Sequence, residues 1–308
     1  MVHVQKASAF SLPIAMSWTS EIPPTPKPTR RITRLLWGYV HYTLVILSYK
    51  YCCWTGQKFD NQIIHLPFGL LLKWSDGTRV EEVLAMQVAR AAGLPVPRVI
   101  CYGEHPDAPN RPISILMTRM PGRELSEVYK MLEPEERGTI SSELKTYIDV
   151  MRSWPNPWGA NRICSVSGAA IRSIRVPRHS IGPYENEQEF NKYLISVARA
   201  GGFKSPSEYE EALATAKEMQ SIPHRVVFTH GDLLHHNILV HNGHVSAILD
   251  WEAAGWLPEY WEFTTAWRFM RPGSWWHDFV RDLGGGSYLK EFECEKALAA
   301  LTSCSYYW

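Results

Sequence analysis

The sequence has little of what extracellular, zinc-binding or nucleic-acid-binding proteins carry in quantity. Its six cysteines in 308 residues are too few for a disulfide scaffold, and none forms a C-x-x-C pair typical of structural zinc sites. The 32 Lys and Arg residues nearly balance the 31 Asp and Glu residues, so no net basic field exists to attract nucleic acid. We therefore expect a cytoplasmic protein with reduced thiols and no nucleic-acid partner.

A membrane-spanning run is also lacking near the N-terminus. Residues 35–49 contain no Lys, Arg, Asp or Glu, but this stretch has 15 residues, whereas a spanning helix needs about 20. Because Arg30, Arg31 and Arg34 precede it, membrane association through residues 35–54 is an alternative. A buried helix or strand is the favoured interpretation, and we expect no membrane partner.

The composition is that of a globular chain. Apolar residues make up 45% and charged residues 20%, and 308 residues suffice for two lobes that share a cleft. We expect three parts: a proline-rich arm and apolar segment over residues 1–50, a small lobe over residues 51–119, and a larger lobe over residues 120–308. Sheet patterns dominate the second part and helical patterns the third, so the predicted fold class is α+β.

The second part has the pattern of a small mixed sheet that carries one helix. Two short apolar runs, residues 62–66 and 70–74, flank a Pro-Phe-Gly turn and indicate a hairpin. Apolar residues recur at helical spacing over residues 79–92. Residues 99–103 and 113–117 have the composition of two further strands.

The residues that can carry chemistry lie between positions 226 and 262. A predicted strand runs into Asp232, and Asn237 follows on the same loop. A predicted hairpin with an Asn-Gly turn begins after Asn237 and ends at Asp250. Because a hairpin returns its last residue beside its first, we expect Asp250 to lie next to Asn237, with Asp232 on the adjoining loop.

Two carboxylates and one amide that meet at one point form an all-oxygen site. Mg²⁺ prefers such ligands, and it also retains waters and the phosphates of a substrate. Phosphoryl transfer depends mainly on positioning the reactants and neutralising their charge. These three residues therefore predict a phosphoryl-transfer reaction.

The order of these residues resembles a known superfamily. The motif begins with His-Gly-Asp at residues 230–232, continues after four residues with Asn237, and is followed 13 residues later by Asp250. This order is similar to the catalytic loop and metal-binding aspartate of kinases. The His-Gly-Asp form resembles the aminoglycoside phosphotransferase (APH) and choline kinase-like small-molecule kinases. Residues 95–99 and 250–262 resemble the fungal branch of that family, and the likeness covers roughly residues 60–295. It implies a two-lobed protein kinase-like fold and an ATP- and Mg²⁺-dependent phosphotransferase that acts on a hydroxyl of a small molecule.

The resemblance also assigns roles to single residues. It implies that Asp232 is the catalytic base, that Asn237 and Asp250 are the magnesium ligands, and that Lys73 contacts the α- and β-phosphates of ATP. The partners in binding are then a nucleotide and a small-molecule acceptor.

The acidic partner of Lys73 is expected on the helix that follows it. Helical geometry places Glu81 nearer the apolar stripe, whereas the family-like spacing Glu-x-x-Ala-Met selects Glu82, which we choose. The resemblance also implies that the backbone from Met117 to Arg119 is the hinge that reads adenine.

The chain departs from the family pattern before Lys73. No Gly-rich G-x-G-x-x-G loop precedes this lysine, so the first strand of the small lobe is expected within residues 40–58. The departure supports a second hypothesis, a catalytically weak or inactive pseudokinase or binding module of the same fold. A protein kinase is a third hypothesis, disfavoured by His-Gly-Asp and by the lack of an Ala-Pro-Glu motif after Asp250.

Three glutamates follow the metal-binding aspartate. Glu252, Glu259 and Glu262 lie within 13 residues of it and could form an acidic wall that favours an amine-bearing acceptor. The alternative is that these carboxylates only cap and hold helices.

Overall fold

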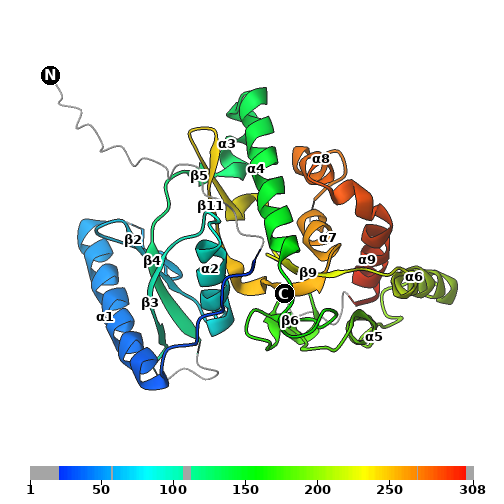
Figure 1. Ribbon diagram of the computed structural model, residues 1–308, viewed down its shortest axis with the longest axis horizontal. Helices are drawn as coiled ribbons and strands as arrows, with labels where there is room; N and C mark the ends of the chain where they lie inside the picture. The colour runs from blue at the N-terminus through cyan, green and yellow to red at the C-terminus, as the bar shows by residue number, and fades with distance from the viewer. Residues whose placement is uncertain (1–20, 57, 107–111, 269, 303–308) are drawn as a thin grey trace.

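A four-stranded antiparallel sheet forms the centre of the small lobe, with strand order β1-β2-β4-β3. The computed structural model describes residues 21–56, 58–106, 112–268 and 270–302. Figure 1 shows helix α1 on the outer side of this sheet and helix α2 on the side that faces the larger lobe. The elements of the small lobe are α1 (Arg31–Thr55), β1 (Ile63–Leu66), β2 (Leu70–Trp74), α2 (Val80–Ala91), β3 (Val99–Glu104) and β4 (Ile113–Thr118).

The larger lobe consists mainly of helices, with short strands that carry the loops (Figure 1). Its first elements are β5 (Arg123–Glu124), α3 (Leu125–Val128), α4 (Pro134–Ser153), β6 (Cys164–Ser165), β7 (Ile171–Arg172), β8 (Ser180–Ile181), α5 (Glu187–Ile195) and α6 (Pro206–Glu218). Its last elements are β9 (Val226–Thr229), β10 (Ile238–His241), β11 (His244–Ile248), β12 (Gly255–Pro258), α7 (Trp261–Trp267), α8 (Trp275–Asp282) and α9 (Leu289–Thr302).

The expected elements of the small lobe are present. The β1–β2 hairpin, helix α2 and strands β3 and β4 match the predicted positions to within about two residues. The predicted hairpin between Asn237 and Asp250 is also present, as β10 and β11, which pair through a turn at Asn242 and Gly243. Both turn residues have positive φ, 52° and 76°, as a type I′ turn requires.

Helix α1 replaces a strand that we expected, so the prediction of a first strand within residues 40–58 is wrong. Gly38 allows close approach to the sheet, because a Cβ there would lie 1.7 Å from the carbonyl oxygen of Glu104. His41 is fully buried and its Nδ1 lies 2.7 Å from Ser114 Oγ, and Arg34 pairs with Glu104 at 2.8 Å. Among the described helices, none combines the length and hydropathy that a bilayer span requires.

One hydrophobic core joins the two lobes. Val83 and Leu84 of α2 belong to the same buried cluster as Trp251 and Ile248, which flank the end of β11. The backbone N–H of Ile248 donates to the carbonyl of Pro95 at 2.7 Å, which adds a direct link between the lobes. Because α2 packs against the segment after β11, residues on the two elements are held at fixed positions relative to each other.

The tryptophans of the larger lobe are mainly core residues. Five of them are at most 1% exposed: Trp251, Trp256, Trp261, Trp267 and Trp276. Trp275 is only half-buried and stacks on Tyr129 with ring centroids 3.9 Å apart.

Candidate active site

Strand β9 leads directly into the predicted catalytic loop, which begins at His230 and ends at Asn237. Gly231 turns the chain with φ 79°, and a Cβ at this position would lie 2.3 Å from the carbonyl oxygen of Ala253. Glycine is therefore required there both by conformation and by space. The His-Gly-Asp form of the motif follows from this close approach to the segment after β11.

His230 holds the loop to the end of β11. Its Nε2 lies 2.8 Å from the carbonyl oxygen of Leu249, and its Nδ1 lies 3.3 Å from the backbone nitrogen of Asp232. These contacts fit a neutral ring that donates through Nε2 and accepts through Nδ1. Burial lowers the pKa of His230 to about 4, which keeps the ring neutral at physiological pH.

Asp232 and Asn237 face each other across the loop. The amide nitrogen of Asn237 donates to the Asp232 side chain at 3.1 Å and to the Asp232 carbonyl oxygen at 2.9 Å. Burial and the nearby charge of Asp250 together raise the pKa of Asp232 to about 7. A carboxylate with this pKa can accept a proton near neutral pH, as a general base must.

Asp250 lies two residues after the end of strand β11 and has a left-handed backbone conformation, with φ 63° and ψ 66°. Few non-glycine residues adopt this region, and strained positions of this kind concentrate at functional sites. Its carboxylate lies 2.9 Å from Lys73 Nζ, and the same nitrogen lies 2.8 Å from Glu82. The structure thus places a small-lobe lysine between a carboxylate of each lobe.

The ionisation states of Lys73, Glu82 and Asp250 depend on one another. Burial disfavours the ionised lysine, but attraction to Glu82 and Asp250 outweighs burial and raises the pKa of Lys73 above its usual range. Burial likewise opposes ionisation of Asp250, and Lys73 reverses the effect, so the pKa of Asp250 is lowered. Lys73 and Asp250 are therefore both charged, and the predicted pairing of Lys73 with Glu82 rather than Glu81 agrees with the observed contact.

Several oxygen ligands are available for a cation at this point. Glu82, Asp250 and Glu252 each offer a carboxylate oxygen, and these atoms lie within 4.8 Å of one another. The amide nitrogen of Asn237 is engaged with Asp232, so the amide oxygen is the atom that Asn237 could offer to a cation. A set of oxygen donors with negative charge fits Mg²⁺. Glu252 was expected in the acceptor site, and the structure places it beside Glu82 and Asp250, at the predicted metal site.

The other two glutamates of the predicted acidic wall lie in different surroundings. Glu262 is 1% exposed and accepts from the backbone N–H groups of His230 and Gly231 at 2.6 and 3.1 Å. Glu259 pairs with Arg225 at 2.9 Å. The structure therefore places Glu262 beneath the catalytic loop and Glu259 in a peripheral ion pair.

Glu252 has a basic partner that sequence reasoning did not identify. Its carboxylate forms a hydrogen-bonded ion pair with Arg172 of β7. Arg172 lies 80 residues earlier in the chain and belongs to no recognisable motif. Only the tertiary structure brings the two residues together, so no local signal could have revealed the pair.

We expect Glu262→Gln to destabilise the protein by about 2–4 kcal/mol, because the new amide would place a donor group opposite buried backbone N–H groups. The free energy of unfolding measured by denaturant titration provides the test. Glu259→Gln is the matched control, since its partner Arg225 is 72% exposed and we expect a loss of about 1 kcal/mol or less. Equal losses in both variants would contradict the role of Glu262 beneath the loop.

The predicted hinge lies at the end of β4. Met117 pairs with Leu71 and Val99 on the two neighbouring strands, and the N–H of Arg119 donates to the carbonyl of Gly69 at 2.7 Å. The hinge backbone is therefore engaged with the sheet. Adenine recognition by the N–H of Arg119 would require this hydrogen bond to be exchanged.

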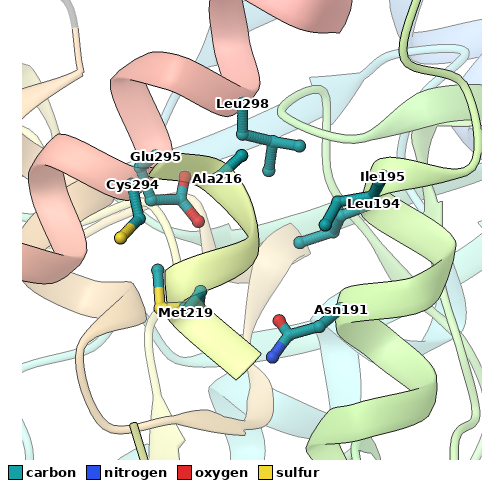
Figure 2. Close-up of a pocket in the computed structure, with 8 residues that line it drawn as sticks. All are labelled: Asn191, Leu194, Ile195, Ala216, Met219, Cys294, Glu295 and Leu298. Carbon is teal, nitrogen blue, oxygen red and sulfur yellow. The ribbon is translucent and has the colours of Figure 1, made fainter. Parts of the chain in front are cut away.

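A pocket in the larger lobe lies apart from these residues. Figure 2 shows it between helices α5, α6 and α9. It is lined by Asn191, Leu194, Ile195, Ala216, Met219, Cys294, Glu295 and Leu298. Its lining includes none of the predicted site residues, and Glu295 already pairs with Arg175. We assign no catalytic role to this pocket.

The sheet lobe supplies a lysine–glutamate pair, which faces Asp232, Asn237 and Asp250 of the helical lobe. This arrangement is typical of protein kinase-like phosphotransferases. The model of the phosphotransferase enzyme family (APH) matches residues 71–295. The match covers well over half of the 308 residues, and the chain belongs to this family. No curated protein matches the sequence at a significant level.

Solved structures support the same fold at low sequence identity. A thermostable mutant of aminoglycoside phosphotransferase APH(4)-Ia, in a ternary complex with ADP and hygromycin B, is 16% identical, with a TM-score of 0.51 over 82% of this chain and 87% of that chain. The GDP complex of wild-type aminoglycoside 2'-phosphotransferase-IIIa is 11% identical, with a TM-score of 0.52 over 85% of this chain and 88% of that chain. The predicted two-lobed protein kinase-like fold is thereby confirmed.

Proposed function

We propose that this protein is an ATP- and Mg²⁺-dependent kinase that phosphorylates a hydroxyl group of a small molecule. One observation carries the proposal: Lys73 joins Glu82 of the small lobe to Asp250 of the larger lobe, beside a half-buried Asp232 with a raised pKa. Asp232 takes the proton of the acceptor hydroxyl while the hydroxyl oxygen bonds to the γ-phosphorus and the bond to ADP breaks.

The remaining residues orient the nucleotide and hold the metal. Asp250 and Asn237 would bind Mg²⁺, with Glu252 close enough to assist, and the ion supplies charge neutralisation at the phosphates. Lys73 reaches the phosphates as a point charge. The hinge from Met117 to Arg119 is our candidate for adenine contact.

We further propose that the acceptor carries an amine. The support is the surplus of acidic groups at the site, where Asp232, Asp250, Glu252 and Glu82 outnumber Lys73 and Arg172. The phosphates of the nucleotide would neutralise part of the positive charge at the site, so the remaining carboxylates would form an acidic surface for a cationic acceptor. Of the three glutamates first considered, Glu252 is the one near the reacting groups.

A transfer screen tests the proposal. Purified full-length protein with ATP and Mg²⁺ is tested against amino alcohols, aminoglycosides and neutral alcohols, and Asp232→Asn serves as the control. Turnover that depends on both Mg²⁺ and Asp232 would support the kinase. Nucleotide binding without transfer to any acceptor would favour the pseudokinase, and transfer only to neutral alcohols would reject the amine.

The pH profile of a confirmed reaction should show an acid limb. Because the pKa of Asp232 is about 7, we expect kcat/KM to fall about tenfold for each pH unit well below that value, as the base becomes protonated. An initial-rate series from pH 5 to pH 9 measures this directly. A flat profile down to pH 5 would show that Asp232 does not act as a base with this pKa.

Two further features belong to the proposal, the location and the branch of the family. The five described cysteines are free, which favours the expected cytoplasmic location. The fungal branch stays a prediction from the motifs near Asp250 and Pro95.

A further inference from the structure

Helix α1 has an apolar surface on the side that faces away from the sheet. Ile32, Leu36, Tyr39, Leu47 and Trp54 follow one stripe of this surface, and their exposed fractions are 69%, 65%, 58%, 56% and 83%. Eleven of the 17 large hydrophobic side chains that are exposed in the described residues belong to this one helix. Such a concentration of exposed apolar groups marks an interaction surface.

The opposite side of α1 is already occupied. Gly38 and His41 are buried against β3 and β4, and Leu44 and Val45 pack on the outer core of the sheet. The helix is therefore apolar both toward the sheet and away from it. A helix that is apolar on all sides is normally covered on all sides. In the described part of the chain, the outer stripe lies exposed and so lacks such a cover.

The charged residues from position 22 to position 59 all have one sign, and the acidic residues Glu21 and Asp60 stand just outside this range. Residues 22–59 contain six basic residues and no acidic one. Lys27 and Arg30 are exposed just before the helix, and Lys50 and Lys58 are exposed at its other end. Glu104, the acidic residue beneath the helix, is 4% exposed and pairs with Arg34, so it does not neutralise the basic groups at the ends.

Tyrosine and tryptophan are frequent on the same surface. Tyr39, Tyr42, Tyr49, Tyr51 and Trp54 are each at least half exposed. Their rings combine an apolar body with a polar group, which suits them to the boundary between lipid headgroups and acyl chains. An apolar stripe, aromatic flanks and basic ends are the features of helices that lie in the plane of a membrane surface.

We propose that α1 binds the surface of an anionic lipid bilayer, with its outer stripe inserted among the headgroups and its basic ends on the lipid phosphates. A second copy of the chain fits less well. Two α1 helices packed face to face would bring basic ends together, whichever way they run, without an acidic residue between positions 22 and 59 to offset the repulsion. A lipid surface instead supplies negative charge at both ends.

The sequence favoured a protein without a membrane partner because no span is long enough. Contact with one leaflet needs no span, and the exposure of α1 supplies the observation that the sequence lacked. The proposal does not depend on the kinase activity, because α1 lies on the far side of the sheet from helix α2 and the larger lobe (Figure 1).

Vesicle co-sedimentation of the full-length protein tests this surface. Vesicles of phosphatidylcholine alone are compared with vesicles that contain 30% phosphatidylserine, at low and high salt. We expect binding to the anionic vesicles that weakens as salt increases. The variant Leu36→Ser/Leu47→Ser should bind at least about tenfold more weakly, because two exposed leucines no longer insert. The control Met131→Ser/Leu289→Ser alters residues that are 63% and 50% exposed elsewhere, and it should bind like the parent.

A second variant, which alters only charges, tests the proposal even where the leucine variant fails to fold. Lys27→Gln/Lys50→Gln/Lys58→Gln changes only exposed groups, and each lost charge should weaken binding to anionic vesicles by about fivefold. Parent protein that does not bind anionic vesicles, or charge and leucine variants that bind as the parent does, would overturn the proposal. Analytical ultracentrifugation tests whether a second copy of the chain occupies this face. If the parent protein does not bind vesicles but forms a dimer, and Leu36→Ser/Leu47→Ser dissociates that dimer, the face belongs to a second copy.

Discussion

Replacement of Asp232 by Asn is expected to lower kcat by about 10²- to 10⁴-fold, because the variant keeps the shape of the side chain but cannot accept the hydroxyl proton. The amide can retain the contact with Asn237, so the loop should stay in place. Nucleotide affinity measured by calorimetry should change little. Unchanged turnover of a confirmed acceptor would show that Asp232 is not the base.

The same variant is expected to be more stable than the parent above neutral pH. The pKa of Asp232 is raised from 3.8 to about 7 in the fold, so the folded protein loses stability as pH rises from about 4 to 7 and Asp232 must ionise while buried. Removal of the ionisable group should stabilise the fold by roughly 2–4 kcal/mol at pH 8, or about 4–8 °C in Tm.

Thermal melts at several pH values test this second effect. The advantage of Asp232→Asn should be present at pH 8 and should vanish near pH 4, where the parent carboxyl is neutral in both states. Asp149→Asn, at an exposed position on α4, is the control and should leave Tm nearly constant at both values. An Asp232→Asn variant that melts below the parent at pH 8 would contradict the destabilising effect of the half-buried charge that we infer.

The catalytic loop could be predicted because its structure is local. A strand, an Asn-Gly hairpin and a return strand bring Asn237 and Asp250 together within 13 residues, so hydrogen bonding along one hairpin decides the geometry. Lys73 could be placed by its position at the end of a short apolar run. Its contact with Asp250, 177 residues away, was not predicted, because only the tertiary structure brings the two residues together.

The parts that failed depend on long-range packing. Residues 31–55 form a helix and not a strand because Gly38 and His41 fit against β3 and β4, partners that lie more than 60 residues away. Glu262 and Glu259 look alike in sequence, but one is buried beneath the catalytic loop and the other pairs at the surface. Their surroundings are set by tertiary contacts, which a charge pattern does not reveal.

Replacement of Asp250 by Asn is expected to remove most of the Mg²⁺ dependence of nucleotide binding. The variant keeps the size of the side chain and tolerates the left-handed conformation at φ 63°, which Ala would strain. Loss of the charged ligand should weaken ATP binding in the presence of Mg²⁺ by about 10²-fold or more, because the ion loses its carboxylate and the phosphates lose their bridge.

Calorimetry with ATP, with and without Mg²⁺, measures the effect of Asp250→Asn. Lys73 should stay in place, since Glu82 still holds it at 2.8 Å, so binding without the metal should change much less. Asp76→Asn is the control: Asp76 belongs to the same lobe as Lys73, its side chain is 99% exposed, and the metal dependence should be retained. An equal gain from Mg²⁺ in the parent and in Asp250→Asn would mean that another group, with Glu252 the nearest candidate, binds the ion.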